Sequence, residues 1–155
     1  IYTGEDTLSL HDALPISVKA AVKIPVLANG DIRTPEQAKF VLEKTGADAV
    51  MIGRGAYGRP WLLGQVMAVL RGEGERPDPG IDEQYDVITS HYRAMIEHYG
   101  EMTGVNMARK HLGWYVKGLH GSAEFRNKVN QIPDSRGVLD ALEQFYGPYL
   151  SKAAA

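Results

Sequence analysis

The stretch Ile24–Trp61 reads IPVLANGDIRTPEQAKFVLEKTGADAVMIGRGAYGRPW and decides the fold. It contains two short apolar runs, residues 24–28 and 47–52, and each run ends abruptly in glycine and polar residues. The segment between them has a helical pattern, so the order is that of a β-α-β unit in a parallel sheet. The first run does not alternate polar and apolar residues, which predicts a strand covered on both faces.

The ends of the intervening helix are marked in the sequence. Thr34 can cap its first turn, Pro35 suits its first position, and Gln37 completes a T-x-x-Q capping box. Gly46 can end the helix in a left-handed conformation. We therefore expect a helix between these residues.

Polar and small residues follow both strands. Asn29-Gly30-Asp31 comes after the first run and Gly53-Arg54-Gly55 after the second. Small residues let backbone N–H groups approach an anion, arginine neutralises its charge, and the start of a following helix adds a favourable dipole. These residue types predict a phosphate site at the carboxyl ends of the strands.

Several motifs here resemble one enzyme family. The segments IPVLANGDI, TGADAVMIGR and GRPW, and RKHLGWY further along, resemble the bacterial B-type tRNA-dihydrouridine synthases. That resemblance extends from about Ser17 to about Leu150. It implies an α/β plus all-α chain: a C-terminal fragment, with the last two β/α units of a flavin-dependent TIM barrel, followed by a small helical bundle domain that binds RNA.

The same resemblance implies a cofactor site and a reaction. It assigns FMN binding to Asn29, Gly30, Asp31, Gly53 and Arg54, with the last two holding the phosphate, where TIM barrels recurrently bind phosphate. The implied reaction reduces uridine to 5,6-dihydrouridine in tRNA, with NADPH as the reductant. In that family a loop cysteine in the first half of the barrel supplies a proton. The present sequence has no cysteine, so no catalytic residue is assigned.

Length and composition set limits on these expectations. The chain has 155 residues, 44% hydrophobic and 23% charged, and a formal net charge of −2. A complete barrel needs about 250 residues. We therefore expect the isolated chain neither to bind flavin tightly nor to be active. The absence of cysteine excludes disulfides and agrees with a cytoplasmic location. No apolar run approaches the roughly 18 residues of a membrane span.

Residues 1–16 match none of the family motifs. They read IYTGEDTLSLHDALPI and resemble one reading frame of a sequencing adapter. We expect this segment to be non-native, with the first strands of the barrel missing before Ser17. The alternative is a divergent surface helix capped by Thr7 or Ser9.

The rest of the chain divides at a linker. Residues 17–71 form the expected barrel part, and the Gly- and Pro-rich residues 72–81 form a linker. Residues 82–150 form the expected helical domain, with helical patterns over 85–99, 105–119, 123–129 and 138–146 and a break at 100–104.

Basic residues concentrate in the helical half. Five basic residues and one acidic residue lie between Gly104 and Lys128. The resemblance makes Arg109, Lys110, His111 and Lys117 candidates for binding RNA, in which cations contact phosphates and an aromatic ring stacks on a base. The pattern alone favours an ordinary solvated helix face, with Trp114 anchored in the core.

Other readings of the sequence remain open. From the residues alone, Asp31 is equally suited to binding a flavin hydroxyl and to capping the turn after Gly30. Asp31 and Asp48 are expected at opposite strand ends, which excludes shared acid–base work. The histidines lack a metal-ligand spacing, so no metal site is expected. A different phosphate-binding TIM-barrel enzyme, or a helical RNA-binding module with the β-α-β part as scaffold, are the alternative functions.

Overall fold

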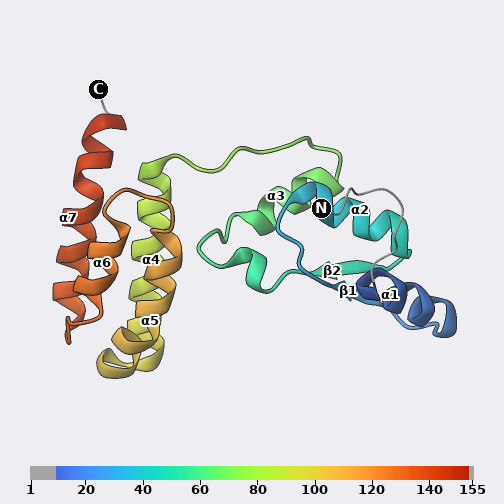
Figure 1. The fold of residues 1–155 in the computed structure, drawn as a ribbon, viewed down its shortest axis with the longest axis horizontal. Helices are drawn as coiled ribbons and strands as arrows, with labels where there is room; N and C mark the ends of the chain where they lie inside the picture. The colour runs from blue at the N-terminus through green and yellow to red at the C-terminus, as the bar shows by residue number, and fades with distance from the viewer. Residues whose placement is uncertain (1–9, 154–155) are drawn as a thin grey trace, which may run out of the picture. The chain divides into compact units, whose positions relative to one another are not determined.

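The structure is a computed structural model that describes the backbone of residues 10–153 and the side chains of residues 16–151. The chain divides into two compact units, Ile1–Pro77 and Asp78–Ala155, and Figure 1 shows the elements of each. The division falls inside the predicted linker, residues 72–81. No helix within the described range is long and apolar enough to cross a membrane.

The first unit contains the predicted β-α-β order. Strand β1 (Leu27–Asn29), helix α2 (Pro35–Thr45) and strand β2 (Ala49–Met51) follow one another, and the two strands pair in parallel. Ala28 lies opposite Val50 in this register. Both strands are shorter than the apolar runs that predicted them, since residues 24–26 and 47–48 lie outside the regular ladder.

Helix α2 has the predicted caps. The Thr34 hydroxyl accepts from the backbone N–H of Gln37 at 3.3 Å. The Gln37 side chain reaches back to the N–H of Arg33 at 2.8 Å, one residue before the cap. Gly46 ends the helix with φ 64°, and its N–H donates to the Leu42 carbonyl. These bonds satisfy helix-end groups that would otherwise lack partners.

The core of this unit lies between α2 and its neighbours. Helix α2 contacts both strands, and it also contacts α1 (Leu10–Ala21) and α3 (Leu62–Leu70). One cluster joins the strands to α2 and a second joins α2 to α3. The buried residues of these clusters are Val26, Ala28 and Ala47 in the first and Ile32, Ala38, Leu62 and Val66 in the second.

The other face of the sheet is open in the described part of the chain. Leu27 of β1 is 60% exposed and Met51 of β2 is 44% exposed, whereas Ala28, the residue after Leu27 in β1, is buried. Successive strand side chains point to opposite faces, and α2 covers one of these faces. The prediction that the first strand is covered on both faces is therefore wrong for this chain.

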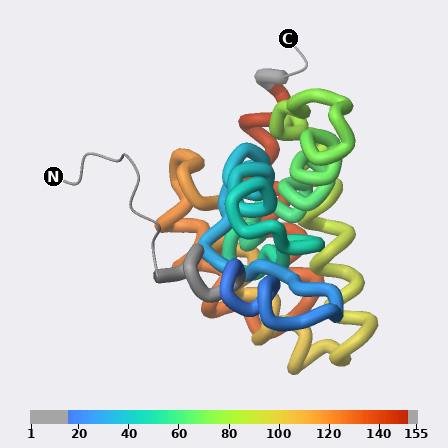
Figure 2. Tube along the Cα trace, turned by 90° about the vertical axis from the view of Figure 1, so that its right-hand side faces the viewer, coloured from blue at the N-terminus to red at the C-terminus, as the bar shows by residue number. Residues whose placement is uncertain are grey.

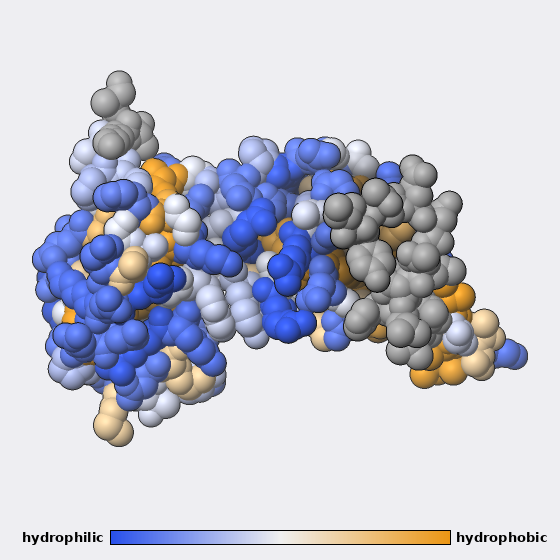
Figure 3. Space-filling view, in the orientation of Figure 1, coloured by the Kyte–Doolittle hydropathy of each residue, from blue (hydrophilic) through white to orange (hydrophobic). Residues whose placement is uncertain are grey.

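The second unit contains four helices within the described range. They are α4 (Ile81–Tyr99), α5 (Glu101–Tyr115), α6 (Ser122–Val129) and α7 (Ser135–Ala153). The chain reverses between α4 and α5, which is visible at the lower edge of Figure 2. Figure 3 shows that the visible face of this unit is mostly hydrophilic. The helical pattern over 105–119 predicts an apolar stripe, of which Val105, Ala108, Leu112 and Val116 are buried, whereas Leu119 is half-buried.

Several predicted helix boundaries were wrong. Helix α4 begins at Ile81, before the predicted residue 85, and α5 ends at Tyr115, before the predicted residue 119. The break expected over 100–104 is confined to Gly100, which has φ 74°, and α5 begins at Glu101. Gly104 lies inside α5, where a Cβ would stand 2.9 Å from Ile96 Cδ1. Its lack of a side chain therefore permits close helix packing. Helix α7 extends beyond the predicted 138–146 and continues through Pro148.

Candidate functional site

A hollow of about 570 Å³ lies at the carboxyl ends of the two strands. Asn29 ends β1 and Met51 ends β2, so the segments that follow the strands meet at one edge of the sheet. The hollow brings together all five residues expected to bind the cofactor. Its lining consists of Asn29, Gly30, Asp31, Met51, Gly53, Arg54 and Gly55.

An ion pair joins the two sides of this hollow. Arg54 donates from Nη2 to Oδ1 of Asp31 at 3.0 Å. Arg33 approaches the same oxygen at 3.9 Å. The Arg54 side chain is 76% exposed and that of Asp31 is 62% exposed, so the guanidinium remains accessible to a ligand. The Asp31 carboxylate thus orients Arg54, a role that sequence analysis did not anticipate.

Gly55 brings the second segment close to the first. It lies in the short 3-10 helix η1 (Arg54–Ala56), which follows β2. A Cβ on Gly55 would stand 2.1 Å from the carbonyl oxygen of Ile32, a distance no side chain tolerates. Gly55 also lines the hollow; it belongs to the segment predicted to bind phosphate, although the resemblance did not assign it to the cofactor. Met51 lines the hollow too, and no sequence signal pointed to it.

The composition of the hollow suits a phosphate. Three glycines leave backbone groups uncovered, Arg54 supplies a planar fork of donors, and Asn29 adds an amide. Asp31 is its single acidic residue. Within the described residues, no group of three or more His, Cys, Asp or Glu side chains is placed to hold a metal ion.

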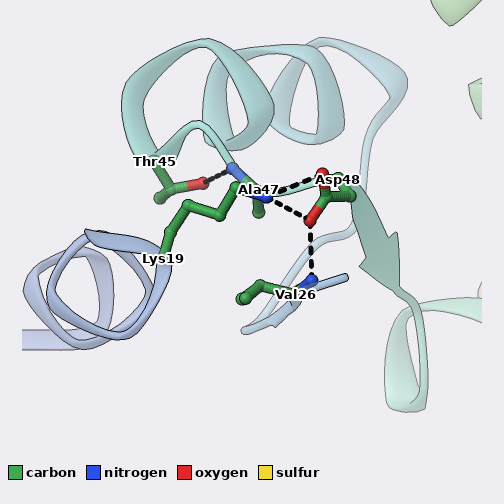
Figure 4. Close-up of polar contacts among 5 residues, drawn as sticks. All are labelled: Lys19, Val26, Thr45, Ala47 and Asp48. Carbon is green, nitrogen blue, oxygen red and sulfur yellow. Dashed lines mark hydrogen bonds and ion pairs between the residues drawn. The ribbon is translucent and has the colours of Figure 1, made fainter. Parts of the chain in front are cut away.

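The amino-terminal ends of the strands carry a separate polar cluster. Asp48 accepts from Lys19 Nζ at 2.6 Å and from the Val26 N–H at 2.7 Å (Figure 4). The hydrogen bond from Lys19 lowers the pKa of Asp48. The Thr45 hydroxyl accepts a hydrogen bond from the N–H of Ala47, the residue before Asp48. Asp48 therefore joins α1 to the strands and lies at the end opposite Asp31, as predicted.

A second hollow, of about 460 Å³, lies in the helical unit between α5 and α6. It includes two of the four predicted RNA-binding residues, Arg109 and Lys110. His111 and Lys117 are not part of its lining. The full lining is Asn106, Arg109, Lys110, Gly113, Trp114, Arg126 and Asn130.

His111 and Lys117 have different surroundings. The His111 ring lies edge-on to that of His91, with centroids 5.3 Å apart, and to that of Trp114, at 4.9 Å. Burial is the main cause that lowers the pKa of His111, and His91 and Lys110 add to it. His91 binds the Tyr115 hydroxyl at 3.0 Å. Lys117 is exposed and lies two residues after Tyr115, the last residue of α5.

Sequence comparison gives a consistent family. The model of the family described as dihydrouridine synthase (Dus) matches residues 16–149. A probable tRNA-dihydrouridine synthase of Rickettsia bellii is 50% identical over 136 residues, which cover 88% of this chain and 42% of the relative.

Two relatives carry the name tRNA-dihydrouridine synthase B. The protein of Vibrio vulnificus is 47% identical over 94% of this chain and 44% of its own length. That of Xanthomonas axonopodis pv. citri is 46% identical over 99% of this chain and 47% of its own length. The chain thus spans less than half the length of these relatives. Because the family model covers most of its residues, the chain belongs to the dihydrouridine synthase family.

Proposed function

We propose that this chain supplies the FMN-phosphate site and tRNA contacts of an enzyme that reduces uridine to 5,6-dihydrouridine in tRNA. Family membership and the names of the relatives support this proposal. In that enzyme the β-α-β unit would be the end of a TIM barrel, and NADPH would be the reductant. FMN, when bound, supplies the hydride.

The convergence of the two strand ends is the observation that carries the proposal. Arg54 would bind phosphate oxygens through the guanidinium donors that Asp31 leaves available. The backbone at Gly30 and Gly53 would approach the phosphate closely because no side chain intervenes. Asn29 would hydrogen-bond the cofactor, and Asp31 would hold Arg54 in place.

The proposal assigns no proton donor to this chain. The sequence contains no cysteine, and the hollow contains no acid besides Asp31, which is paired with Arg54. The exposed sheet face at Leu27 and Met51 would form part of a wall that further strands complete. We therefore propose that the 155-residue chain alone is inactive.

The helical unit would bind tRNA through its cations. Lys110 and Lys117 are exposed and would contact phosphates. Arg109 donates from Nη2 to the Ile132 carbonyl at 3.1 Å, so part of its guanidinium is already used. His111, packed against His91, would contribute less than the lysines.

The activity test joins this chain to the part of a relative that it does not span. The amino-terminal part of the Vibrio vulnificus relative would be fused before Ser17 and incubated with FMN, NADPH and tRNA lacking dihydrouridine. We expect dihydrouridine to form, and Arg54→Ala to remove bound flavin. Arg71→Ala, an exposed arginine outside the hollow, is the matched control. A folded, flavin-loaded fusion that leaves uridine intact would contradict the proposed activity.

The tRNA contact is tested on the 155-residue chain itself. The double substitution Lys110→Ala and Lys117→Ala should weaken tRNA binding and flatten its dependence on salt, because fewer counterions are released. Arg54→Ala should leave this binding unchanged. If the double substitution changes neither the affinity for tRNA nor its salt dependence, Lys110 and Lys117 are not the proposed tRNA contacts.

A further inference from the structure

The hollow between α5 and α6 has positive charge without a compensating acid. Lys110 and Arg126 line it, and neither forms an ion pair with any residue that the structure describes. Glu124 is the single acid between residues 104 and 128, and it is not among the lining residues. Uncompensated cations facing one concave surface attract an anionic ligand.

An aromatic ring stands beside these cations. Trp114 lies four residues after Lys110, so the two side chains project from the same side of α5. The Trp114 ring is half-buried, and the edge-on ring of His111 supports it. A supported indole at the wall of a charged hollow is a platform for a stacked base.

Gly113 shapes the space between the two helices. A Cβ at this position would stand 3.4 Å from Arg126 Cδ and 3.6 Å from its Cγ, so the arginine stem passes close to α5. Arg126 is exposed and sits on α6 one turn before Asn130, which also lines the hollow. The hollow thus collects donors from two helices.

Arg109 forms a supporting part of the same hollow. Its Nη2 binds the Ile132 carbonyl, which follows α6, and its Nε is buried without a hydrogen-bond partner within the described structure. This contact ties α5 to the segment between α6 and α7. Arg109 is therefore held by the protein itself, whereas Lys110 and Arg126 form no ion pair with the described residues.

We propose that this hollow binds one unpaired nucleotide of RNA, with the base stacked on Trp114 and the adjoining phosphate bound by Lys110 and Arg126. The inference rests on the proposed tRNA function and specifies the contact. Its volume of about 460 Å³ lies in the range of small-molecule sites, about 300–1,000 Å³. A paired base is already stacked in its helix, so an unpaired base fits the site better. The amides of Asn106 and Asn130 can bind base edges.

The test uses the full 155-residue chain with Trp61→Phe, which leaves Trp114 as the one tryptophan. The probes are a single-stranded oligouridylate of about ten nucleotides and a duplex RNA of the same length. We expect the single strand to quench Trp114 fluorescence saturably and to bind more tightly than the duplex. Far-UV circular dichroism checks that the helices are intact.

Substitutions then separate the parts of the site. Measured by anisotropy of labelled RNA, Trp114→Leu should reduce single-strand affinity roughly tenfold. Arg126→Ala should lower the slope of log affinity against log salt by about 0.7. Gly113→Ala should also weaken binding, because its methyl group narrows the hollow. Arg136→Ala, an exposed arginine on α7 outside the hollow, should change only the general electrostatic attraction.

Two results would overturn the inference in distinguishable ways. Salt-dependent RNA binding without quenching, and unaffected by Trp114→Leu, would leave the proposed tRNA contact standing and exclude the nucleotide site. Absence of any RNA binding by a folded chain would overturn both. Equal affinity for the single strand and the duplex would also contradict a site for an unpaired nucleotide.

Discussion

Arg54 donates a 3.0 Å hydrogen bond to Asp31, which lies 23 residues earlier in the chain. Asp31 follows β1 and Arg54 follows β2, so this contact joins the two segments at the end of the sheet where both strands stop. An exposed pair of this kind contributes about 0–1 kcal/mol to stability. Its main consequence is therefore the orientation of the Arg54 guanidinium beside the glycines of the hollow.

Gly55→Ala should destabilise the first unit by about 1–3 kcal/mol, because the added methyl group would overlap the Ile32 carbonyl. Urea unfolding measures this loss. Gly64→Ala in α3 is the matched control, since a Cβ there meets no atom within 4 Å. If both variants unfold at the same urea concentration, the close approach of η1 to the segment after β1 is wrong.

Gly104→Ala should destabilise the helical unit by about 1–3 kcal/mol despite the higher helix propensity of alanine. A Cβ at this position would lie 3.0 Å from both the Ile96 Cα and the Met95 carbonyl oxygen. Gly113→Ala, also inside α5, has more space and should stabilise by about 0.5–1 kcal/mol. Thermal unfolding of the two variants should therefore shift in opposite directions, and a Gly104→Ala variant as stable as the unsubstituted chain would contradict the α4–α5 packing.

Acid should destabilise the contact between α4 and α5. Burial lowers the pKa of His91 and of His111 below their ordinary value of 6.5. The folded state then holds fewer protons than the unfolded state, so stability is fully present above pH 6.5 and falls as the pH drops below it. The free energy of unfolding should be lower at about pH 5.5 than at about pH 8.

Substitution identifies the histidines responsible for this pH dependence. His91→Asn should flatten the dependence, because it removes one of the two facing imidazoles while Tyr115 and His111 remain. His98→Asn, on the exposed side of α4, is the control and should retain the wild-type dependence. A pH profile that is unchanged by His91→Asn would exclude this imidazole pair as its source.

Local sequence signals predicted the β-α-β unit because each acts over a few residues. Thr34, Gln37 and Gly46 form the predicted caps of α2, and each apolar run overlaps one strand. The prediction that both faces of β1 are covered was wrong, because the burial of a strand depends on the elements that pack against it. Gly104 was misread as part of a helix break, since only the packing against Ile96 reveals its role.

The sequence predicted which residues lie around the hollow at the strand ends, but not all of the contacts between them. Parallel strands bring their carboxyl ends together, which placed the predicted residues around one hollow. The pairing of Arg54 with Asp31 depends on side-chain reach and was not foreseen. In the helical unit, the spacing along α5 did not reveal Arg126 and Asn130, because these residues come from α6 and from the position directly after it.

The 155-residue chain should purify without stoichiometric flavin. Its described sheet has two strands with one open face, so it offers part of a pocket for a bound isoalloxazine ring. The visible absorbance spectrum of the purified chain measures this directly. A stable yellow complex with one flavin per chain would contradict the proposed incompleteness of the site.

The most direct test of the phosphate site compares FMN with riboflavin, which lacks the phosphate, by NMR titration of the 155-residue chain. FMN should bind weakly and shift the backbone amide signals of Gly30, Gly53, Arg54 and Gly55, whereas riboflavin should leave them unchanged. Arg54→Ala should abolish these shifts, and Arg71→Ala should preserve them. Equal shifts with both compounds, or shifts confined to residues outside the hollow, would contradict a phosphate site at the ends of β1 and β2.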